Sequence, residues 1–161
     1  MWGFLKMSKE KKKHEGMTLI TKTVTNSLVG IIAMFGANIA FYGHLTPGGG
    51  FAGGVIIACA FILLMLTHGK GVTLRKFPDL AASLLDNIGS LMFVAIGLLG
   101  YIGGVFFYNF ITKDEPFGLL SSGTILFSNI AIMLKVMAGL FAVFVGLSIW
   151  GRIVSDTDKE E

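Results

Sequence analysis

Charged residues are scarce in this chain of 161 residues, and they are unevenly distributed. Asp, Glu, Lys and Arg make up 14% of the sequence, whereas soluble domains carry roughly 25%. No such residue occurs between Lys22 and Lys70, or between Asp86 and Lys113. Both uncharged stretches exceed the roughly 18 residues that are enough for a helix to cross a bilayer. The sequence therefore predicts an integral membrane protein and excludes a soluble globular domain.

Cysteine is almost absent as well, since Cys59 is the only one. A single cysteine excludes disulfides within the chain and cysteine-rich metal or iron–sulfur sites. The sequence offers no Ser–His–Asp or Cys–His set and no ligands at metal-binding spacing. We therefore expect no catalytic residues, no metal site and no cofactor in this chain. A secretory signal is also not expected, because no small-residue cleavage site follows the first apolar run.

The uncharged stretches divide into four predicted spans. The first stretch holds two helices of about 20 residues each, separated by turn-forming sequence from His44 to Gly50. The predicted spans are Thr25–Tyr42, Phe51–Thr67, Asn87–Ile111 and Ser128–Trp150. The third can extend back to Pro78, because proline suits the first turn of a helix. A loop or re-entrant turn at Ser121-Ser122-Gly123 precedes the last span.

The expected fold class is thus all-α integral membrane, with four transmembrane helices. A single four-helix domain covers residues 25–151, between a basic tail at 1–24 and a short tail at 152–161. Lysines and arginines predict the orientation. One side carries Lys6, Lys9, Lys11, Lys12, Lys13, Lys22, Lys70, Arg75, Lys76, Arg152 and Lys159, and the other carries Lys113. By the positive-inside rule, both termini are cytoplasmic and the protein is a multi-pass protein of the cell membrane. The basic tail fits topology control or anionic lipid, and we expect no nucleic-acid partner.

The segment from Gly43 to Gly54 has the most unusual composition in the chain. It reads Gly43-His44-Leu45-Thr46-Pro47-Gly48-Gly49-Gly50-Phe51-Ala52-Gly53-Gly54. Backbone N–H groups in a glycine-rich loop that opens a helix can hold an anion. The segment lacks the Gly-Lys-Ser/Thr ending of a phosphate loop and the Gly-x-Gly-x-x-Gly of a dinucleotide site. Two interpretations remain open, a closely packed hairpin between two helices and a contact for ions.

This segment resembles the signature of the MrpB (MnhB) family. The residues that carry the resemblance are Gly43, His44, Pro47, Gly48, Gly49, Gly50, Phe51, Gly53 and Gly54. The similarity extends from Thr25 to Trp150 and includes Asn129-Ile130-Ala131-Ile132 and Lys135-Val136. Ala52 stands where the family often has glutamine. Family members are small membrane subunits of Mrp-type sodium/proton antiporters and of antiporter-like modules in membrane-bound hydrogenases and related redox complexes.

The resemblance implies an accessory subunit that takes part in cation and proton transport without an active site of its own. It implies a hetero-oligomer with other membrane subunits of the antiporter module. The host is then either a stand-alone antiporter or a redox complex whose partner subunits hold iron–sulfur clusters or nickel. Two other classes stay open. One is a purely structural scaffold for neighbouring subunits, and the other is an independent small transporter that acts as a homo-oligomer.

Three titratable residues are candidates for an ion path. Lys135 lies inside the last predicted span, where a lysine snorkels outward, lines a hydrophilic path or pairs with an acid on a neighbouring subunit. Asp86 is either an ordinary acid at the cytoplasmic start of the third span or an ion ligand. His44 either fixes the hairpin by a hydrogen bond or titrates near neutral pH.

Other polar and small residues within the predicted spans are expected to join helices. Polar side chains there bond to other helices or to bound water, and small residues allow close helix packing. The polar residues are Asn38, Asn87, Asn109, Asn129 and Ser128. The small ones are Gly30, Gly36, Gly97, Gly100, Gly103, Gly104, Gly139 and Gly146. His14 and His68 are expected at exposed ends.

Overall fold

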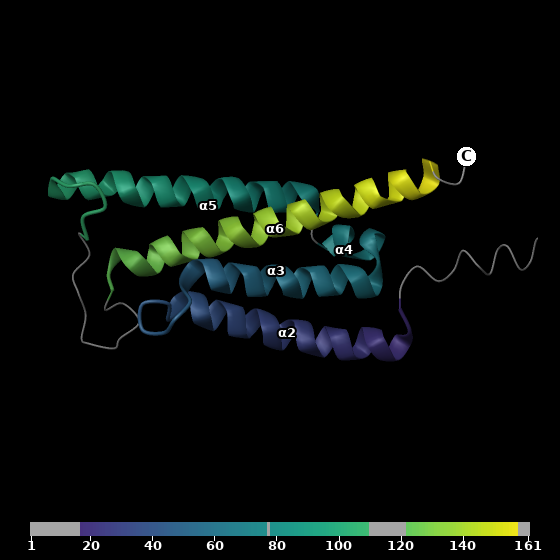
Figure 1. Cartoon of the computed structure of the whole chain (residues 1–161). Coiled ribbons are helices and arrows are strands. Elements are labelled where there is room, and N and C mark those ends of the chain that lie inside the picture. The colour runs from purple at the N-terminus through teal and green to yellow at the C-terminus, as the bar shows by residue number, and fades with distance from the viewer. Residues whose placement is uncertain (1–16, 77, 110–121, 158–161) are drawn as a thin grey trace, which may run out of the picture.

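The protein folds as a bundle of long helices. The structure, a computed structural model, describes residues 17–76, 78–109 and 122–157. The elements in chain order are α2 (Leu19–Phe41), α3 (Gly49–His68), α4 (Lys70–Lys76), α5 (Asp79–Leu99), the 3-10 helix η1 (Gly100–Gly103) and α6 (Thr124–Thr157). The four long helices run side by side (Figure 1). All regular secondary structure in the described residues is helical, as predicted.

Four helices are long and apolar enough to cross a membrane, which confirms the predicted number of spans. They are Leu19–Phe41, Gly49–His68, Leu80–Gly103 and Thr124–Gly151. The start of α2, the short α4, the start of α5 and the end of α6 lie at one end of the bundle (Figure 1). The hairpin between α2 and α3 lies at the opposite end, together with the start of α6. The start of α2 and the end of α6 therefore lie at the same end of the bundle.

The core of the bundle lies where α3, α5 and α6 meet. Met65 of α3, Ala82 of α5, and Phe141 and Val145 of α6 form one buried apolar cluster. The ring of Phe61 packs edge-on against Phe141, with ring centroids 6.1 Å apart. The helix α2 packs mainly on α3. This arrangement leaves much of α2 and α5 exposed, and those surfaces face lipid or other protein in a membrane.

Glycines stand at the closest helix contacts. A Cβ on Gly36 of α2 would lie 2.9 Å from the Gly53 carbonyl oxygen of α3. A Cβ on Gly54 would lie 2.8 Å from the Met133 carbonyl oxygen of α6. Real Cβ atoms do not approach backbone so closely, so these helices pack at distances that only glycine allows. The prediction of close packing is therefore confirmed for Gly36. For Gly30, Gly139 and Gly146, a Cβ would meet nothing within 4 Å among the described residues.

The predicted end of the third span is wrong. The span begins at Asp79, directly after Pro78, but α5 ends at Leu99 and η1 at Gly103, and Ile111 lies outside the described residues. The chain folds back there, because Gly104 adopts a φ of +88° and the Phe107 N–H donates to the Gly97 carbonyl oxygen at 3.3 Å. Phe106 and Phe107 pack against the helix at Gly97 and Gly100, which have no side chains to keep this segment away.

The other spans differ from their predicted bounds at the ends. The first begins at Leu19, and the last runs from Thr124 to Gly151, one residue beyond the predicted end, while the helix α6 itself continues to Thr157. At about 1.5 Å per residue, the 34 residues of α6 reach well beyond a hydrocarbon core of about 30 Å. The turn predicted ahead of this helix is present at Ser122–Gly123, where Gly123 has a φ of +62°. Ser121 lies outside the described residues.

Candidate functional site

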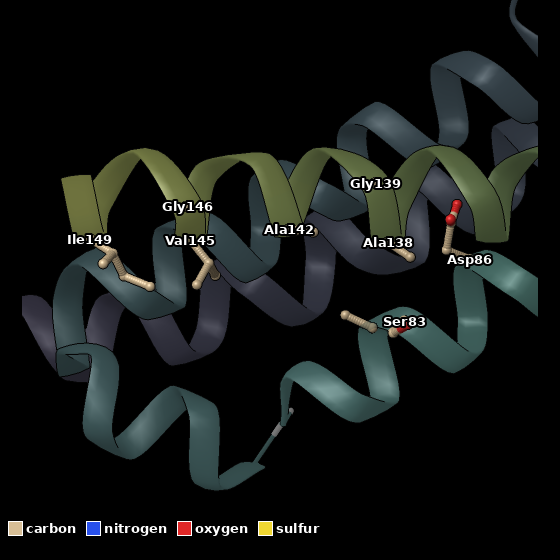
Figure 2. A pocket seen from close by; sticks show the side chains of 9 residues that line it. Ser83, Asp86, Ala138, Gly139, Ala142, Val145, Gly146 and Ile149 are labelled. Carbon is tan, nitrogen blue, oxygen red and sulfur yellow. The ribbon is translucent and has the colours of Figure 1, made fainter. Parts of the chain in front are cut away.

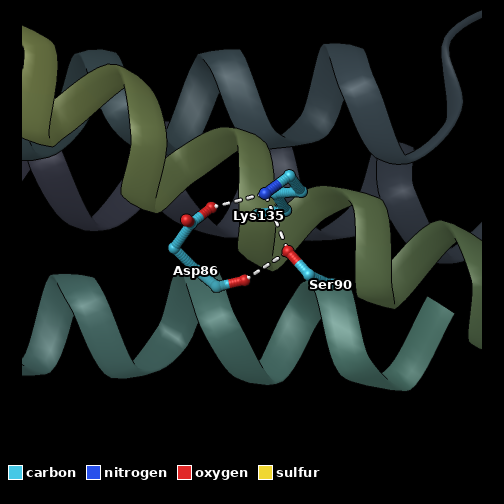
Figure 3. A network of polar contacts seen from close by, with 3 residues as sticks. All are labelled: Asp86, Ser90 and Lys135. Carbon is cyan, nitrogen blue, oxygen red and sulfur yellow. Dashed lines mark hydrogen bonds and ion pairs between the residues drawn. The ribbon is translucent and has the colours of Figure 1, made fainter. Parts of the chain in front are cut away.

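Lys135 of α6 forms a polar network with Asp86 and Ser90 of α5 (Figure 3). Its ammonium Nζ lies 3.0 Å from Asp86 Oδ1, an ion pair, and donates to Ser90 Oγ at 2.7 Å. Ser90 Oγ in turn donates to the backbone carbonyl oxygen of Asp86 at 2.9 Å. Asp86 and Ser90 are one helical turn apart, so both side chains face α6. Two of the three predicted ion-path residues thus lie in direct contact.

Gly89 positions this network, because it lets α5 and α6 approach closely beside it. A Cβ on Gly89 would lie 2.8 Å from the Ala131 carbonyl oxygen and 2.9 Å from the Lys135 backbone nitrogen. The contact places Lys135 opposite the turn of α5 that runs from Asp86 to Ser90. The absence of a side chain at Gly89 therefore allows the close helix contact on which the network depends.

The network lies within α5 and α6 rather than at the first residue of either helix. Asp86 is about 10 Å along α5 from Asp79, at about 1.5 Å per residue. The helix begins at Asp79, within the predicted extension back to Pro78, and the position of Asp86 at the cytoplasmic entrance of the span stays a prediction. Lys135 was expected to snorkel outward, to line a hydrophilic path or to pair with an acid of a neighbouring subunit, and the acid that it contacts belongs to the same chain. The side chains of Lys135 and Asp86 remain 52% and 38% exposed.

The glycine-rich hairpin closes against α6. Leu45 and Thr46 N–H groups both donate to the Tyr42 carbonyl oxygen at 2.9 Å, which forms the turn. Gly49 has a φ of +82°, in the left-handed region that favours glycine. A Cβ on Gly49 would lie 3.5 Å from Asn129 Oδ1 of α6. The hairpin therefore has the tight geometry of the packing interpretation, and contact with ions stays a prediction.

The remaining residues of the glycine-rich motif differ in how far they are buried. Gly50, Gly53 and Gly54 are buried, whereas Phe51 is 64% exposed. His44 is half-buried within the hairpin. His44 belongs to the hairpin between α2 and α3, whereas Lys135 lies in α6 and Asp86 in α5. Of the three candidate ion-path residues, Lys135 and Asp86 are joined by an ion pair.

The other polar residues have varied environments. Asn109 Oδ1 accepts a hydrogen bond from the Thr124 N–H at 3.1 Å, so it fixes the start of α6. Ser128 Oγ donates to the Thr124 carbonyl oxygen of its own helix at 3.1 Å, and a bond from Ser128 to another helix or to bound water stays a prediction. Asn38 and Asn87 are exposed. His68 is half-buried rather than exposed, and His14 lies outside the described residues.

Sequence reasoning missed Ser90 and Gly89. The signal for Ser90 was its spacing of one turn from Asp86, which places both on one helix face. Gly89 had no signal of its own, because the sequence does not say which face of α5 meets α6. Among the residues that the structure describes, no group of three or more His, Cys, Asp or Glu is placed to hold a metal ion.

Comparisons with known proteins agree with the motif and the fold. The sequence matches the family described as "Domain related to MnhB subunit of Na+/H+ antiporter" over residues 20–142. The putative antiporter subunit mnhB2 of Staphylococcus epidermidis is 32% identical over 133 residues, which cover 81% of this chain and 94% of that protein. The uncharacterized protein MJ1307 of Methanocaldococcus jannaschii is 36% identical over 140 residues, 83% of this chain and 51% of that protein.

A solved structure is also similar to this one. The structure of the membrane-bound sulfane sulfur reductase, an archaeal respiratory membrane complex, matches with a TM-score of 0.65 and 32% identity. The match covers 81% of this chain and 60% of the matched chain. This chain thus spans about half the length of MJ1307 and most of the length of mnhB2. With the family matched over most of the sequence, the chain belongs to the MnhB family.

Proposed function

We propose that this protein is an accessory membrane subunit of a multisubunit cation (sodium)/proton antiporter module. It works in a hetero-oligomer with other membrane subunits of that module, and it makes and breaks no covalent bonds itself. Membership of the MnhB family supports this function. So does the near full-length similarity to a putative antiporter subunit.

The observation that carries a part in transport is the Lys135–Asp86–Ser90 network. A charged side chain at the centre of a membrane helix costs about 2.5–3.5 kcal/mol on insertion scales. Two opposite charges in contact reduce this cost, yet both side chains keep an exposed surface. Inside a span, an exposed carboxylate can bind a passing cation, and both the carboxylate and the ammonium can exchange protons. We therefore assign Lys135 and Asp86 to the ion path.

The test of this assignment is Lys135→Ala in the assembled complex. Sodium- or proton-coupled transport is measured in inverted membrane vesicles, and the amount of the subunit is measured by immunoblot. We expect lower transport at an unchanged subunit level. Lys22→Ala is the control, because it removes a lysine near the start of α2. Unchanged transport in Lys135→Ala would instead favour a structural scaffold.

The orientation is part of the proposal. Both termini are assigned to the cytoplasm, because the basic residues Lys22, Lys70, Arg75 and Arg152 belong to the end of the bundle where α2 begins and α6 ends. The test is labelling with a membrane-impermeant maleimide after Cys59→Ser. In intact cells, we expect label at Thr46→Cys and none at Thr18→Cys. The reverse pattern would invert the topology.

Two hosts are consistent with the comparisons. Similarity to mnhB2 favours a stand-alone antiporter, and similarity to a chain of a respiratory complex favours a redox-driven one. In the second case, iron–sulfur clusters or nickel belong to partner subunits. The distinguishing experiment extracts the tagged subunit in mild detergent, identifies the co-purifying chains and assays iron and nickel. A subunit that purifies alone would contradict the accessory role.

A further inference from the structure

A groove runs between α5 and α6 beside the ion pair. It has a volume of about 340 Å³ and is open along one side. Asp86 stands near one end and Ile149 at the other (Figure 2). Small residues form most of its wall, including Ala82 and Ser83 of α5. We propose that this groove docks a membrane-spanning helix of another subunit, and that this helix carries an uncharged polar side chain at the depth of Asp86.

The glycines of α6 in this groove leave open space beside them in the described part of the chain. Gly139 and Gly146 line it together with Ala142, and the three lie on one helix face by their spacing. A Cβ on Gly139 or Gly146 would meet none of the described residues within 4 Å. Gly54 and Gly89, in contrast, are each in contact with the backbone of α6. The space at Gly139 and Gly146 therefore fits the close approach of a helix from outside the chain.

The ion pair defines the chemistry of the occupant. Lys135 uses two of its three N–H groups, on Asp86 Oδ1 and Ser90 Oγ. Within the described part of the chain, Asp86 Oδ2 accepts no hydrogen bond, and Asp86 itself lines the groove. Lipid tails offer no hydrogen bonds to these half-exposed groups. The pair is neutral as a whole, so an amide or hydroxyl that can donate and accept complements it better than a further charge.

This inference rests on the proposed function, because it requires a partner subunit. The first test uses the whole complex in its native membrane. In one variant, the photoreactive residue p-benzoylphenylalanine replaces Ala142 in the groove. In the control variant, it replaces Met34 of α2, which is 78% exposed and lies outside the groove. We expect the Ala142 position to cross-link to a membrane-spanning segment of another subunit, with an Asn, Gln, Ser or Thr in that segment. Adducts with lipid alone, or with a second copy of this chain, would overturn the proposal.

The second test fills the groove with a side chain. Gly139→Leu and Gly146→Leu are chosen because an added Cβ at either position meets no described residue within 4 Å. The matched control is Gly30→Leu on α2, where a Cβ also meets no described residue within 4 Å. We expect each groove variant to reduce co-purification of the partner subunit about tenfold, which corresponds to about 1.4 kcal/mol. Equal co-purification in all three variants, or an equal loss with Gly30→Leu, would overturn the docking face.

The wild-type chain separates this inference from the proposed function. If no other membrane subunit co-purifies with the wild-type chain, the proposed function fails. If partners co-purify but the groove variants keep them, the function stands and the docking face is wrong.

Discussion

Gly50 of α3 lies directly against the backbone of Asn129 in α6. A Cβ on Gly50 would approach the Asn129 carbonyl carbon to 2.9 Å and its carbonyl oxygen more closely still. The contact joins the glycine-rich hairpin to the first turns of α6, which are far away in the sequence. The repeated glycines of the hairpin therefore determine how closely two transmembrane helices pack, and any side chain there must separate them.

We expect Gly50→Ala to destabilise the subunit by about 1–3 kcal/mol, the usual cost of forcing extra atoms into a packed contact. The backbone of Asn129 cannot move aside as a flexible side chain could. The measurement is thermal unfolding of the purified complex in detergent, in which the loss of this subunit from the complex is monitored. Gly30→Ala is the control, because its Cβ meets open space, and it should leave the transition unchanged. An unchanged transition in Gly50→Ala would show that the helices are farther apart than the structure describes.

Gly49→Val tests the backbone conformation of the hairpin. Gly49 has a φ of +82° at the first residue of α3. A residue with a side chain pays about 1–2 kcal/mol in this left-handed region, and a β-branched residue tolerates it least. We expect less subunit in the assembled complex, measured by co-purification. Ala52→Val, three residues later in helical backbone, is the control. Equal assembly of the two variants would contradict the left-handed conformation.

The pairing of Lys135 with Asp86 predicts a coupled effect of their substitutions. Lys135→Met leaves the Asp86 carboxylate without its cation inside the span, and Asp86→Leu leaves the ammonium without its anion. We expect each single variant to destabilise the subunit by about 1–2 kcal/mol, the range of polar contacts between membrane helices. The double variant should be more stable than the sum of the two predicts, because it leaves no unpaired charge. The measurement is a double-mutant cycle on thermal stability in detergent.

Transport adds a second readout to the same cycle. The ion-path assignment predicts that the double variant recovers stability and still fails to transport. If the double variant recovers both stability and transport, Lys135 and Asp86 form only a structural contact. Additive stability effects would show that the two side chains do not touch.

Much of the fold could be predicted from the sequence. The long uncharged stretches determine four spans, and Pro47 with the glycines after it determines where the first two separate. The positions of helix ends were less accurate. The third span ends early because Phe106 and Phe107 fold back on Gly97, and hydropathy does not distinguish an apolar residue in a span from one that packs against it.

The candidate site could be predicted only in part. Lys135 stood out because charges inside spans are rare, and Asp86 because it is an acid at the predicted start of a span. The sequence does not give the register between α5 and α6, which depends on Gly89 against Ala131. The start of α5 at Asp79, in contrast, agrees with the predicted extension of the third span back to Pro78. The sequence therefore identifies Lys135 and Asp86 as candidates, whereas their contact follows from the way that α5 packs against α6.

Asn109→Ala tests how the last span is fixed at its start. Asn109 Oδ1 accepts from the Thr124 N–H at 3.1 Å, and its Nδ2 donates to the Ser122 carbonyl oxygen at 3.2 Å. The first N–H groups of a helix have no partner within it, so a side chain that caps them stabilises the helix by about 0.5–2 kcal/mol. We expect Asn109→Ala to increase amide hydrogen exchange in the first turn of α6, from Thr124 to Phe127, measured by mass spectrometry on the complex. Asn26→Ala on the exposed surface of α2 should leave that exchange unchanged. Exchange that rises equally along the whole of α6 would mean that Asn109 holds the bundle together rather than this one helix end.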